Sequence, residues 1–278
     1  MRVAKEYADM TKNRFSKMKT IVLTLSAVVV GASLCNTEAA AAERLRRVVV
    51  WSECTAPKNM YPNDINGAIA DTLRTLKGWE VITANLDQPD QGISDELLKS
   101  TDVLVWWGHK KHGKVNDDLV KRIVQRVKED GMGFISLHSA HYAKPFKAVL
   151  LEIAKPNDEE MRKRVGSWGA YKCDSAVKVM VKDADHPICK GVEKCFDLGD
   201  TERYGEKFVV PEPEAVPFDC EYRFPDGHTE KARHGLCWTV GKGKVFYFQT
   251  GHETCKHYYE PNVQRILRNA VEWAAPKK

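Results

Sequence analysis

Histidine residues follow three apolar runs in this chain of 278 residues. Five of the nine histidines are in these positions: His109, His112, His138, His141 and His252. Glu253 stands beside the last of them, and Glu53 follows a fourth apolar run. Imidazoles and carboxylates at close range can bind a divalent metal ion or carry acid–base chemistry. The sequence therefore predicts a polar site made from the ends of several strands, although a single such histidine is more often a surface or capping residue.

A metal centre is one interpretation of this set. The spacing His109-x-x-His112 is compatible with shared ligation on a turn, and His141 is a third candidate ligand. Zinc is the divalent ion that suits imidazole and carboxylate ligands best in this setting. No nucleotide cofactor is expected.

A nucleophilic site is the other interpretation. A turn from strand to helix exposes its side chain at the sheet edge, so His138 and Ser139 are catalytic candidates there. Ser139 would be the nucleophile, His252 its base and Glu253 the residue that orients the base. The glycines of a Gly-x-Ser-x-Gly elbow are absent around Ser139. Both interpretations stay open.

Further candidates would bind a substrate. The acidic segment 200–206 contains Glu202, Arg203 and Tyr204, and Arg203 could pair with a carboxylate of the site or of a ligand. The same segment could instead be a solvated charged loop. Trp107 at a strand end could stack on a sugar ring or belong to the core, and the same choice applies to Trp51 and Trp106. Glu53 completes the set of predicted substrate-binding residues.

The elements that must position these residues alternate between strand and helix. Apolar runs predict strands at 46–51, 79–84, 102–107 and 133–137, and helical spacing predicts helices at 63–76, 117–130 and 145–153. This alternation is typical of an α/β fold with a parallel sheet covered by helices on both faces. Ligands of such sheets bind at the carboxyl ends of the strands. After residue 155 the sequence predicts short strands, a hairpin across Gly241-Lys242-Gly243 and a final helix from Pro261.

The N-terminus has the features of an export signal. A basic start is followed by an apolar run from Ile21 to about Leu34 and by four alanines at 39–42. Residues 1–42 are therefore predicted to be an N-terminal extension plus a secretory signal peptide, with Met1 or Met18 as the start. Lipidation at Cys35 is not expected, because Leu34 replaces the usual small residue. The expected product is a periplasmic or extracellular protein with one domain over 43–278 and no transmembrane segment.

The net charge and the cysteine content limit the classes of binding partner that can be expected. The formal net charge is +5, and removal of residues 1–42 with six basic and three acidic residues leaves +2. A mature chain so close to neutral gives no electrostatic case for nucleic acid or a membrane surface. Seven of the eight cysteines follow residue 42, so export would permit disulfides such as Cys189 with Cys195 and leave an odd thiol. A homo-oligomer is left open.

An ordered set of motifs resembles the ThuA (trehalose-utilisation) family. The motifs span most of the mature chain: Val105-Trp106-Trp107-Gly108-His109 with His112, Leu137-His138-Ser139-Ala140-His141-Tyr142, Asp185-His186-Pro187-Ile188 with Gly191, Glu202-Arg203-Tyr204-Gly205-Glu206, and Gly251-His252-Glu253-Thr254 followed by Pro261 and a helix to Ala275. The resemblance implies a flavodoxin-like three-layer α/β/α sandwich with a mainly parallel sheet, related to class I glutamine amidotransferases.

The resemblance also sets expectations for function. Amidotransferases carry a cysteine on the elbow, where this chain has His138 or Ser139, and they space the late histidine and glutamate one residue apart, whereas His252 and Glu253 are adjacent. Glutamine amidotransferase activity is therefore not expected. The family is associated with disaccharide and keto-sugar utilisation, which implies a small sugar substrate and a hydrolase or isomerase. A non-catalytic carbohydrate-binding or regulatory module is the alternative.

Overall fold

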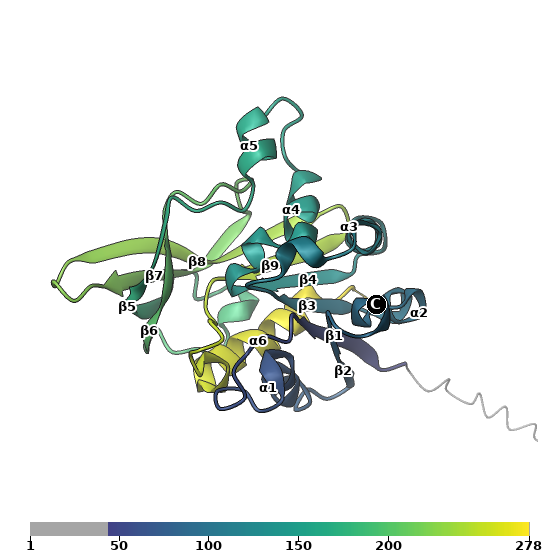
Figure 1. Cartoon of the computed structure of the whole chain (residues 1–278), viewed down its shortest axis with the longest axis horizontal. Coiled ribbons are helices and arrows are strands. Elements are labelled where there is room, and N and C mark those ends of the chain that lie inside the picture. The colour runs from purple at the N-terminus through teal and green to yellow at the C-terminus, as the bar shows by residue number, and fades with distance from the viewer. Residues whose placement is uncertain (1–43, 278) are drawn as a thin grey trace, which may run out of the picture. The chain divides into compact units, whose positions relative to one another are not determined.

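Five strands form the parallel half of a nine-stranded sheet with the order β2-β1-β3-β4-β9-β8-β7-β5-β6 (Figure 1). The computed structural model describes residues 44–277, except for the side chains of residues 172–174. The parallel strands are β1 (Arg46–Ser52), β2 (Trp79–Asn85), β3 (Val103–Trp107), β4 (Gly133–Leu137) and β9 (Gly243–Phe248). Each neighbouring pair among them is parallel, so their carboxyl ends lie along one edge.

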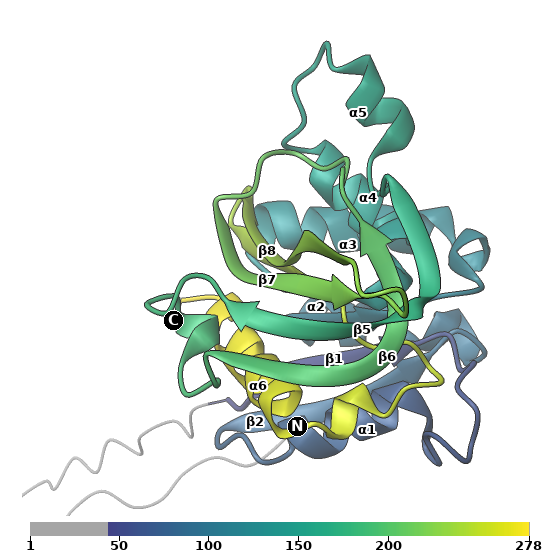
Figure 2. The same ribbon diagram turned by 90° about the vertical axis from the view of Figure 1, so that its left-hand side faces the viewer.

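The other four strands are antiparallel and continue the sheet beyond β9 (Figure 2). They are β5 (Ala170–Val181), β6 (Cys195–Gly205), β7 (Ala215–Arg223) and β8 (Thr229–Val240). The protein is thus an α/β protein with a large mixed sheet, and the prediction of a mainly parallel sheet is wrong. The reason lies in the connections, because β7, β8 and β9 are joined by hairpins, which can link only antiparallel neighbours.

Helices cover both faces of the parallel half (Figure 1). The helices are α1 (Asp64–Leu73), α2 (Asp95–Ser100), α3 (Asp117–Asp130), α4 (Lys144–Leu151), α5 (Glu159–Arg164) and α6 (Pro261–Ala274). α1 contacts β1 and β2 and α6 contacts β4 and β9, while α3 packs on α4 and α2 on the opposite side. Local sequence sets the ends of α3: the Asn116 side chain accepts a hydrogen bond from the Asp118 amide at 2.8 Å, and Gly131 ends the helix at φ 79°.

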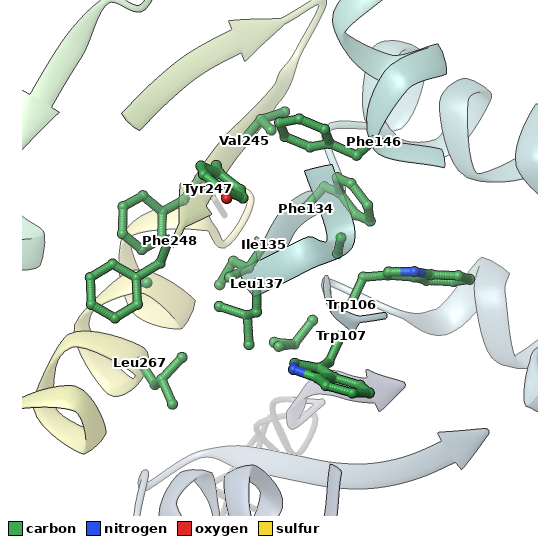
Figure 3. Close-up of a cluster of buried hydrophobic side chains, with 14 of the residues drawn as sticks. Trp106, Trp107, Phe134, Ile135, Leu137, Phe146, Val245, Tyr247, Phe248 and Leu267 are labelled. Carbon is green, nitrogen blue, oxygen red and sulfur yellow. The ribbon is translucent and has the colours of Figure 1, made fainter. Parts of the chain in front are cut away.

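The core lies between the parallel strands and these helices. Aromatic and aliphatic side chains of β3, β4 and β9 meet those of α4 and α6 there (Figure 3). Trp51 and Trp106 stack with their ring centroids 3.7 Å apart, and Trp107 donates a 2.9 Å hydrogen bond to the Gly251 carbonyl. All three tryptophans are fully buried. The core interpretation of these residues is therefore right, and Trp107 offers no surface to a substrate.

Several predictions concern parts that the structure does not describe. The signal peptide, Cys35 and both candidate start residues lie outside residues 44–277. Within the described residues, no helix combines the length and apolarity that crossing a bilayer requires. Cys189 and Cys195, a candidate disulfide pair, are both free thiols.

Candidate functional site

The carboxyl ends of the parallel strands bring the predicted residues to one place. Glu53 follows β1, His109 follows β3 and His138 follows β4, while His252 and Glu253 follow β9. The backbone of His138 has φ 55°, a left-handed conformation that non-glycine residues seldom adopt. Such positions typically cost about 1–3 kcal/mol and cluster at functional sites. The turn after β4 therefore has the strained backbone that is typical of functional sites.

Strand β6 crosses these strand ends, although it is the edge strand at the far end of the sheet order. Tyr204 in β6 accepts a 3.1 Å hydrogen bond at its carbonyl from Gln249, which follows β9, and its hydroxyl contacts Ser139 after β4. The segment 200–206 is thus mainly strand, and the solvated-loop interpretation is wrong. Alternate residues of a strand face opposite sides, so Glu202 and Tyr204 face the site together.

The carboxylate of Glu202 lies among three histidines. Its Oε2 is 3.1 Å from Nε2 of His138, 3.7 Å from Nε2 of His109 and 3.9 Å from Nε2 of His252. The three rings are 4.8–5.4 Å apart, centroid to centroid, in edge-to-face pairs. We call Glu202, Glu253, His109, His138 and His252 the His/Glu centre.

Glu253 fixes the orientation of His109. Nδ1 of His109 lies 2.6 Å from Oε2 of Glu253, and because the carboxylate can only accept, we assign the ring proton to Nδ1. This leaves the Nε2 lone pair of His109 directed to the centre. Lys110 pairs with the other oxygen of Glu253 at 2.5 Å. Burial opposes the charge of Glu253, but its bonds with His109 and Lys110 outweigh that effect and hold its pKa well below the usual range.

The electrostatics favour a charged Glu202 with a neutral His252. Burial would raise the pKa of Glu202, but the close contact with His138 at 3.1 Å dominates and lowers it to about 2. Burial, together with the charge of His138, lowers the pKa of His252 to about 4. Burial also lowers that of His109, yet the contacts with Glu253 and Glu202 outweigh it and the net pKa is raised. At neutral pH the centre therefore holds two carboxylates and a neutral His252.

His138 has one free nitrogen. Its Nδ1 donates a 3.3 Å hydrogen bond to the Gln249 carbonyl, which can only accept. Its Nε2 is buried and has no aligned hydrogen-bond partner, although Glu202 is 3.1 Å away. A buried imidazole nitrogen in that state is available to a proton, a metal ion or a substrate atom.

Glu53 supports the loop that carries His109. One oxygen of this fully buried carboxylate accepts hydrogen bonds from the amides of His109, Lys110 and Lys111 at 3.0, 2.6 and 2.8 Å. Its other oxygen is 3.5 Å from Nδ1 of His112. The substrate-binding role predicted for Glu53 does not suit a carboxylate without exposed surface, and its contacts make it a positioning residue.

Two predicted metal ligands lie outside the centre. His141 is fully buried and donates from Nδ1 to the Gly166 carbonyl at 2.6 Å, and burial lowers its pKa strongly. His112 faces Glu53 rather than the other histidines, and burial also lowers its pKa. The group whose ligand atoms lie within 4.8 Å of one another consists of His109, His138, His252 and Glu253. The ligand set predicted from sequence is thus corrected, with His109 retained.

Arg203 and Ser139 are placed differently from their predicted roles. Arg203 faces away from Glu202 because of strand alternation, pairs with Glu230 at 2.7 Å and stacks over Phe224. The Ser139 hydroxyl contacts the Tyr204 hydroxyl, which donates to Glu202 at 2.7 Å. Among the described hydrogen bonds none joins Ser139 to a histidine, so the base of a Ser-His-Glu triad is missing.

Two cavities meet at Glu202. The larger, about 430 Å³, is lined by His109, His112, Ser139, Tyr142, Trp168, Gly169, Ala170, Tyr171, Glu202 and Tyr204. The smaller, about 160 Å³, reaches Glu202 and His252 from the other side. Three aromatic residues of the larger cavity, Tyr142, Trp168 and Tyr171, were not among the predicted site residues, whereas Tyr204 was. The sequence contains little indication of them, because tyrosine and tryptophan occur in hydrophobic cores as well as in binding sites.

Comparison with known proteins decides the family. The sequence model of the ThuA family, described as trehalose utilisation, matches residues 47–274. This chain belongs to the ThuA family. No curated protein matches the chain significantly.

Solved structures share the ThuA-like fold at low identity. A ThuA-like protein from Parabacteroides merdae is 12% identical, with a TM-score of 0.57 over 85% of this chain and 93% of the other. A second, from Bacteroides uniformis, is 15% identical, with a TM-score of 0.52 over 82% and 90%. The glutaminase domain of the CTPS of Trypanosoma brucei is 7% identical, with a TM-score of 0.47 over 84% and 96%. At these identities the likeness to the two ThuA-like structures concerns the fold alone.

Proposed function

We propose that this ThuA-family protein is an enzyme that acts on a sugar at a divalent metal ion held by the His/Glu centre. The observation that carries the proposal is the position of Glu202, whose Oε2 has the Nε2 atoms of His138, His109 and His252 at 3.1, 3.7 and 3.9 Å. A tetrahedral zinc ion with bonds of about 2.0–2.1 Å separates its ligands by roughly 3.3 Å. The three distances from Glu202 to the imidazole nitrogens are close to that ligand separation.

The surroundings of His109 and His138 suit metal binding as well. Metal-bound imidazoles usually donate their second nitrogen to a carboxylate or carbonyl, which fixes the tautomer. His109 donates to Glu253 at 2.6 Å and His138 faces the Gln249 carbonyl at 3.3 Å. Nδ1 of His252 lies 2.7 Å from the Thr254 hydroxyl and accepts a 3.2 Å hydrogen bond from the Thr254 amide, so the ring proton would have to leave Nε2 when this nitrogen binds the ion. We assign His109, His138, His252 and Glu202 as ligands, with Glu253 as the residue that orients His109.

Each group would have a defined part in sugar chemistry. A bound zinc ion supplies a Lewis acid that polarises a hydroxyl or carbonyl oxygen. Tyr204 donates to Glu202 at 2.7 Å and so holds this carboxylate in place. Burial raises the pKa of Tyr204 well above its usual value, so its hydroxyl keeps its proton. The reaction class that fits is hydrolysis or isomerisation of a neutral or keto sugar, in line with the trehalose utilisation that describes the family.

The position of the site in the fold supports a catalytic or binding role. The parallel half has the order β2-β1-β3-β4-β9, which follows the flavodoxin-like order 2-1-3-4-5, and we take it as a flavodoxin-like α/β/α core. Ligands of such sheets bind where the strand order reverses, here between β1 and β3. Glu53 and His109 follow these two strands. We also propose export of the mature chain, so that its sugar would be met outside the cytoplasm.

Turnover with and without metal tests the proposal. The mature chain is purified, its metal content is measured, and trehalose, other disaccharides and their keto forms are incubated with it while products are followed by chromatography. We expect turnover of at least one of these sugars, its loss on treatment with a chelator and its recovery with Zn²⁺. Undiminished turnover after complete metal removal would refute the metal role, and stoichiometric metal without turnover of any sugar would refute the sugar substrate.

A further inference from the structure

Two exposed tyrosines face the larger cavity beside the His/Glu centre. Tyr171 is 65% exposed and Tyr142 is 45% exposed, and both line this cavity. Large apolar side chains with such exposure are few among the described residues; the others are Leu45, Ile153 and Tyr259. Aromatic surface concentrated at the mouth of a cavity marks a binding site.

The strand register places Tyr171 on the same face of the sheet as Tyr204, which contacts Glu202 at the inner end of the cavity. Tyr171 in β5 lies directly opposite Tyr204 in β6 in their antiparallel pairing. Residues directly opposite in such a pair have side chains on the same face of the sheet. Tyr204 is buried and its hydroxyl donates to Glu202 at 2.7 Å. The two tyrosines therefore lead from the exposed rim of the cavity to its carboxylate end.

Rigid neighbours hold the walls of the cavity. Trp168, which also lines the cavity, stacks on Phe208 with ring centroids 4.0 Å apart and planes 1° apart, and this contact fixes its ring. The Tyr142 ring packs on the buried His141 with centroids 4.4 Å apart. A fixed aromatic wall costs little conformational entropy when a ligand binds.

The charges of the lining select against anionic ligands. Among the residues whose side chains the structure describes, no lysine or arginine lines this cavity, and Glu202 contributes a carboxylate. A phosphate group at the rim, beside Tyr142 and Tyr171 and away from His109 and the ion of the His/Glu centre, would find no lysine or arginine among the described lining residues, which costs binding free energy. An uncharged ring with hydroxyl groups avoids this cost and can present its C–H faces to tyrosine and its hydroxyls to Glu202 and His109.

We infer that Tyr142 and Tyr171 form the ring-binding subsite of this protein, specific for an uncharged polyhydroxylated ring, with Tyr171 as the main specificity-determining residue. The inference rests on the proposed function, because it places the ring against the same centre. It adds the residues that recognise the ring and the exclusion of phosphorylated analogues. Tyr171 does not touch the His/Glu centre, so its loss should leave that centre intact.

Titration calorimetry with trehalose and with glucose as probes tests this subsite. The zinc-loaded wild type is compared with Tyr171→Ala, Tyr171→Phe and, as a matched loss of an exposed tyrosine elsewhere, Tyr259→Ala. We expect Tyr171→Ala to weaken binding about ten-fold, since an aromatic contact adds up to about 1.5 kcal/mol beyond its buried area. Tyr171→Phe should bind within about three-fold of wild type, because the ring face is kept. Trehalose 6-phosphate should bind more weakly than trehalose.

The outcomes separate this inference from the proposed function. Unchanged affinity in Tyr171→Ala, an equal loss in Tyr259→Ala, tighter binding of the phosphate, or no binding of either sugar by the wild type would each overturn the subsite. Metal content and thermal unfolding are measured on the same samples, and both should match wild type in Tyr171→Ala. A wild type that binds sugar with this Tyr171 dependence but holds no metal would support the subsite and refute the metal centre.

Discussion

Nε2 of His138 lies 3.1 Å from Oε2 of Glu202, although the two residues come from opposite halves of the sheet. His138 follows the parallel strand β4, and Glu202 belongs to the antiparallel edge strand β6. Neither half alone contains the His/Glu centre, because the parallel half supplies the histidines and the antiparallel half supplies the carboxylate between them. Substitutions in either half should therefore change the affinity of the His/Glu centre for its metal ion.

Glu202→Gln should weaken zinc binding at least ten-fold. The substitution keeps the shape of the side chain but removes the negative charge that lies 3.1–3.9 Å from three imidazole nitrogens. Even residues outside the ligand shell typically contribute about 10–100-fold to metal affinity. Competition with a chromogenic chelator measures the effect. Glu230→Gln is the control, since Glu230 pairs with Arg203 on the opposite face of β6, and an equal loss in this control would contradict the role of Glu202.

Ser139→Ala should retain turnover within about three-fold of wild type. The Ser139 hydroxyl contacts Tyr204 rather than a histidine, so no base activates it. Loss of a true nucleophile in a triad lowers kcat by orders of magnitude, about 10⁶-fold in the best-studied case. Steady-state rates decide the matter, and labelling by a serine-directed phosphonate provides a second readout. A rate reduced more than a thousand-fold, or labelling that disappears in Ser139→Ala, would reinstate the hydrolase triad.

Glu53→Ala should destabilise the fold and weaken metal binding together. The substitution leaves the amides of His109, Lys110 and Lys111 without their shared acceptor. Fully buried donors without partners cost about 1–3 kcal/mol each; because these three hydrogen bonds are only partly buried, we expect a smaller total loss of about 2–4 kcal/mol in the free energy of unfolding. Denaturant unfolding measures it. Glu53→Gln keeps an acceptor oxygen and should lose less; equal losses in both variants would show that the three hydrogen bonds are not the cause.

Acid should destabilise the protein through buried histidines away from the centre. Burial lowers the pKa of His234 to about 3 and that of His257 to about 4. In the unfolded chain both titrate near about 6.5, so between this value and the folded pKa only the unfolded state binds the proton. The free energy of unfolding should fall with decreasing pH by about 1.4 kcal/mol per pH unit for each histidine. Urea unfolding of wild type and His234→Gln measures this, and an equal pH slope in both would contradict the assignment.

The sequence predicts where the His/Glu centre lies better than it predicts which residues form the centre. Parallel strands share one carboxyl edge, so residues that follow apolar runs, such as His109 and His138, can be expected to meet. The direction of each imidazole depends on the conformation of a tight turn. Sequence periodicity does not predict that conformation, so the contacts of each ring nitrogen could not be predicted. His141 illustrates this, because its turn directs the ring into the core against the Gly166 carbonyl.

The contribution of β6 was harder to predict. Its sequence around Glu202, Arg203 and Tyr204 is charged, so it does not have the apolar pattern that predicts a strand. The order of strands in the sheet cannot be predicted from periodicity either. The period of two was nevertheless present, since Glu202 and Tyr204 face the site while Arg203 faces Glu230. Recognition of 200–206 as a strand would have separated the true candidates from Arg203. The aromatic cavity around Tyr171 depends on the pairing of β5 with β6 and could not be predicted without it.

The metal content of the purified protein tests the central proposal most directly. Elemental analysis of protein expressed with zinc should give about one ion per chain for the wild type and for His112→Ala, because His112 faces Glu53 outside the His/Glu centre. His138→Ala should lose the ion, because it removes the buried Nε2 that lies nearest to Glu202. A wild type without stoichiometric metal, or an ion retained in His138→Ala, would contradict the metal centre.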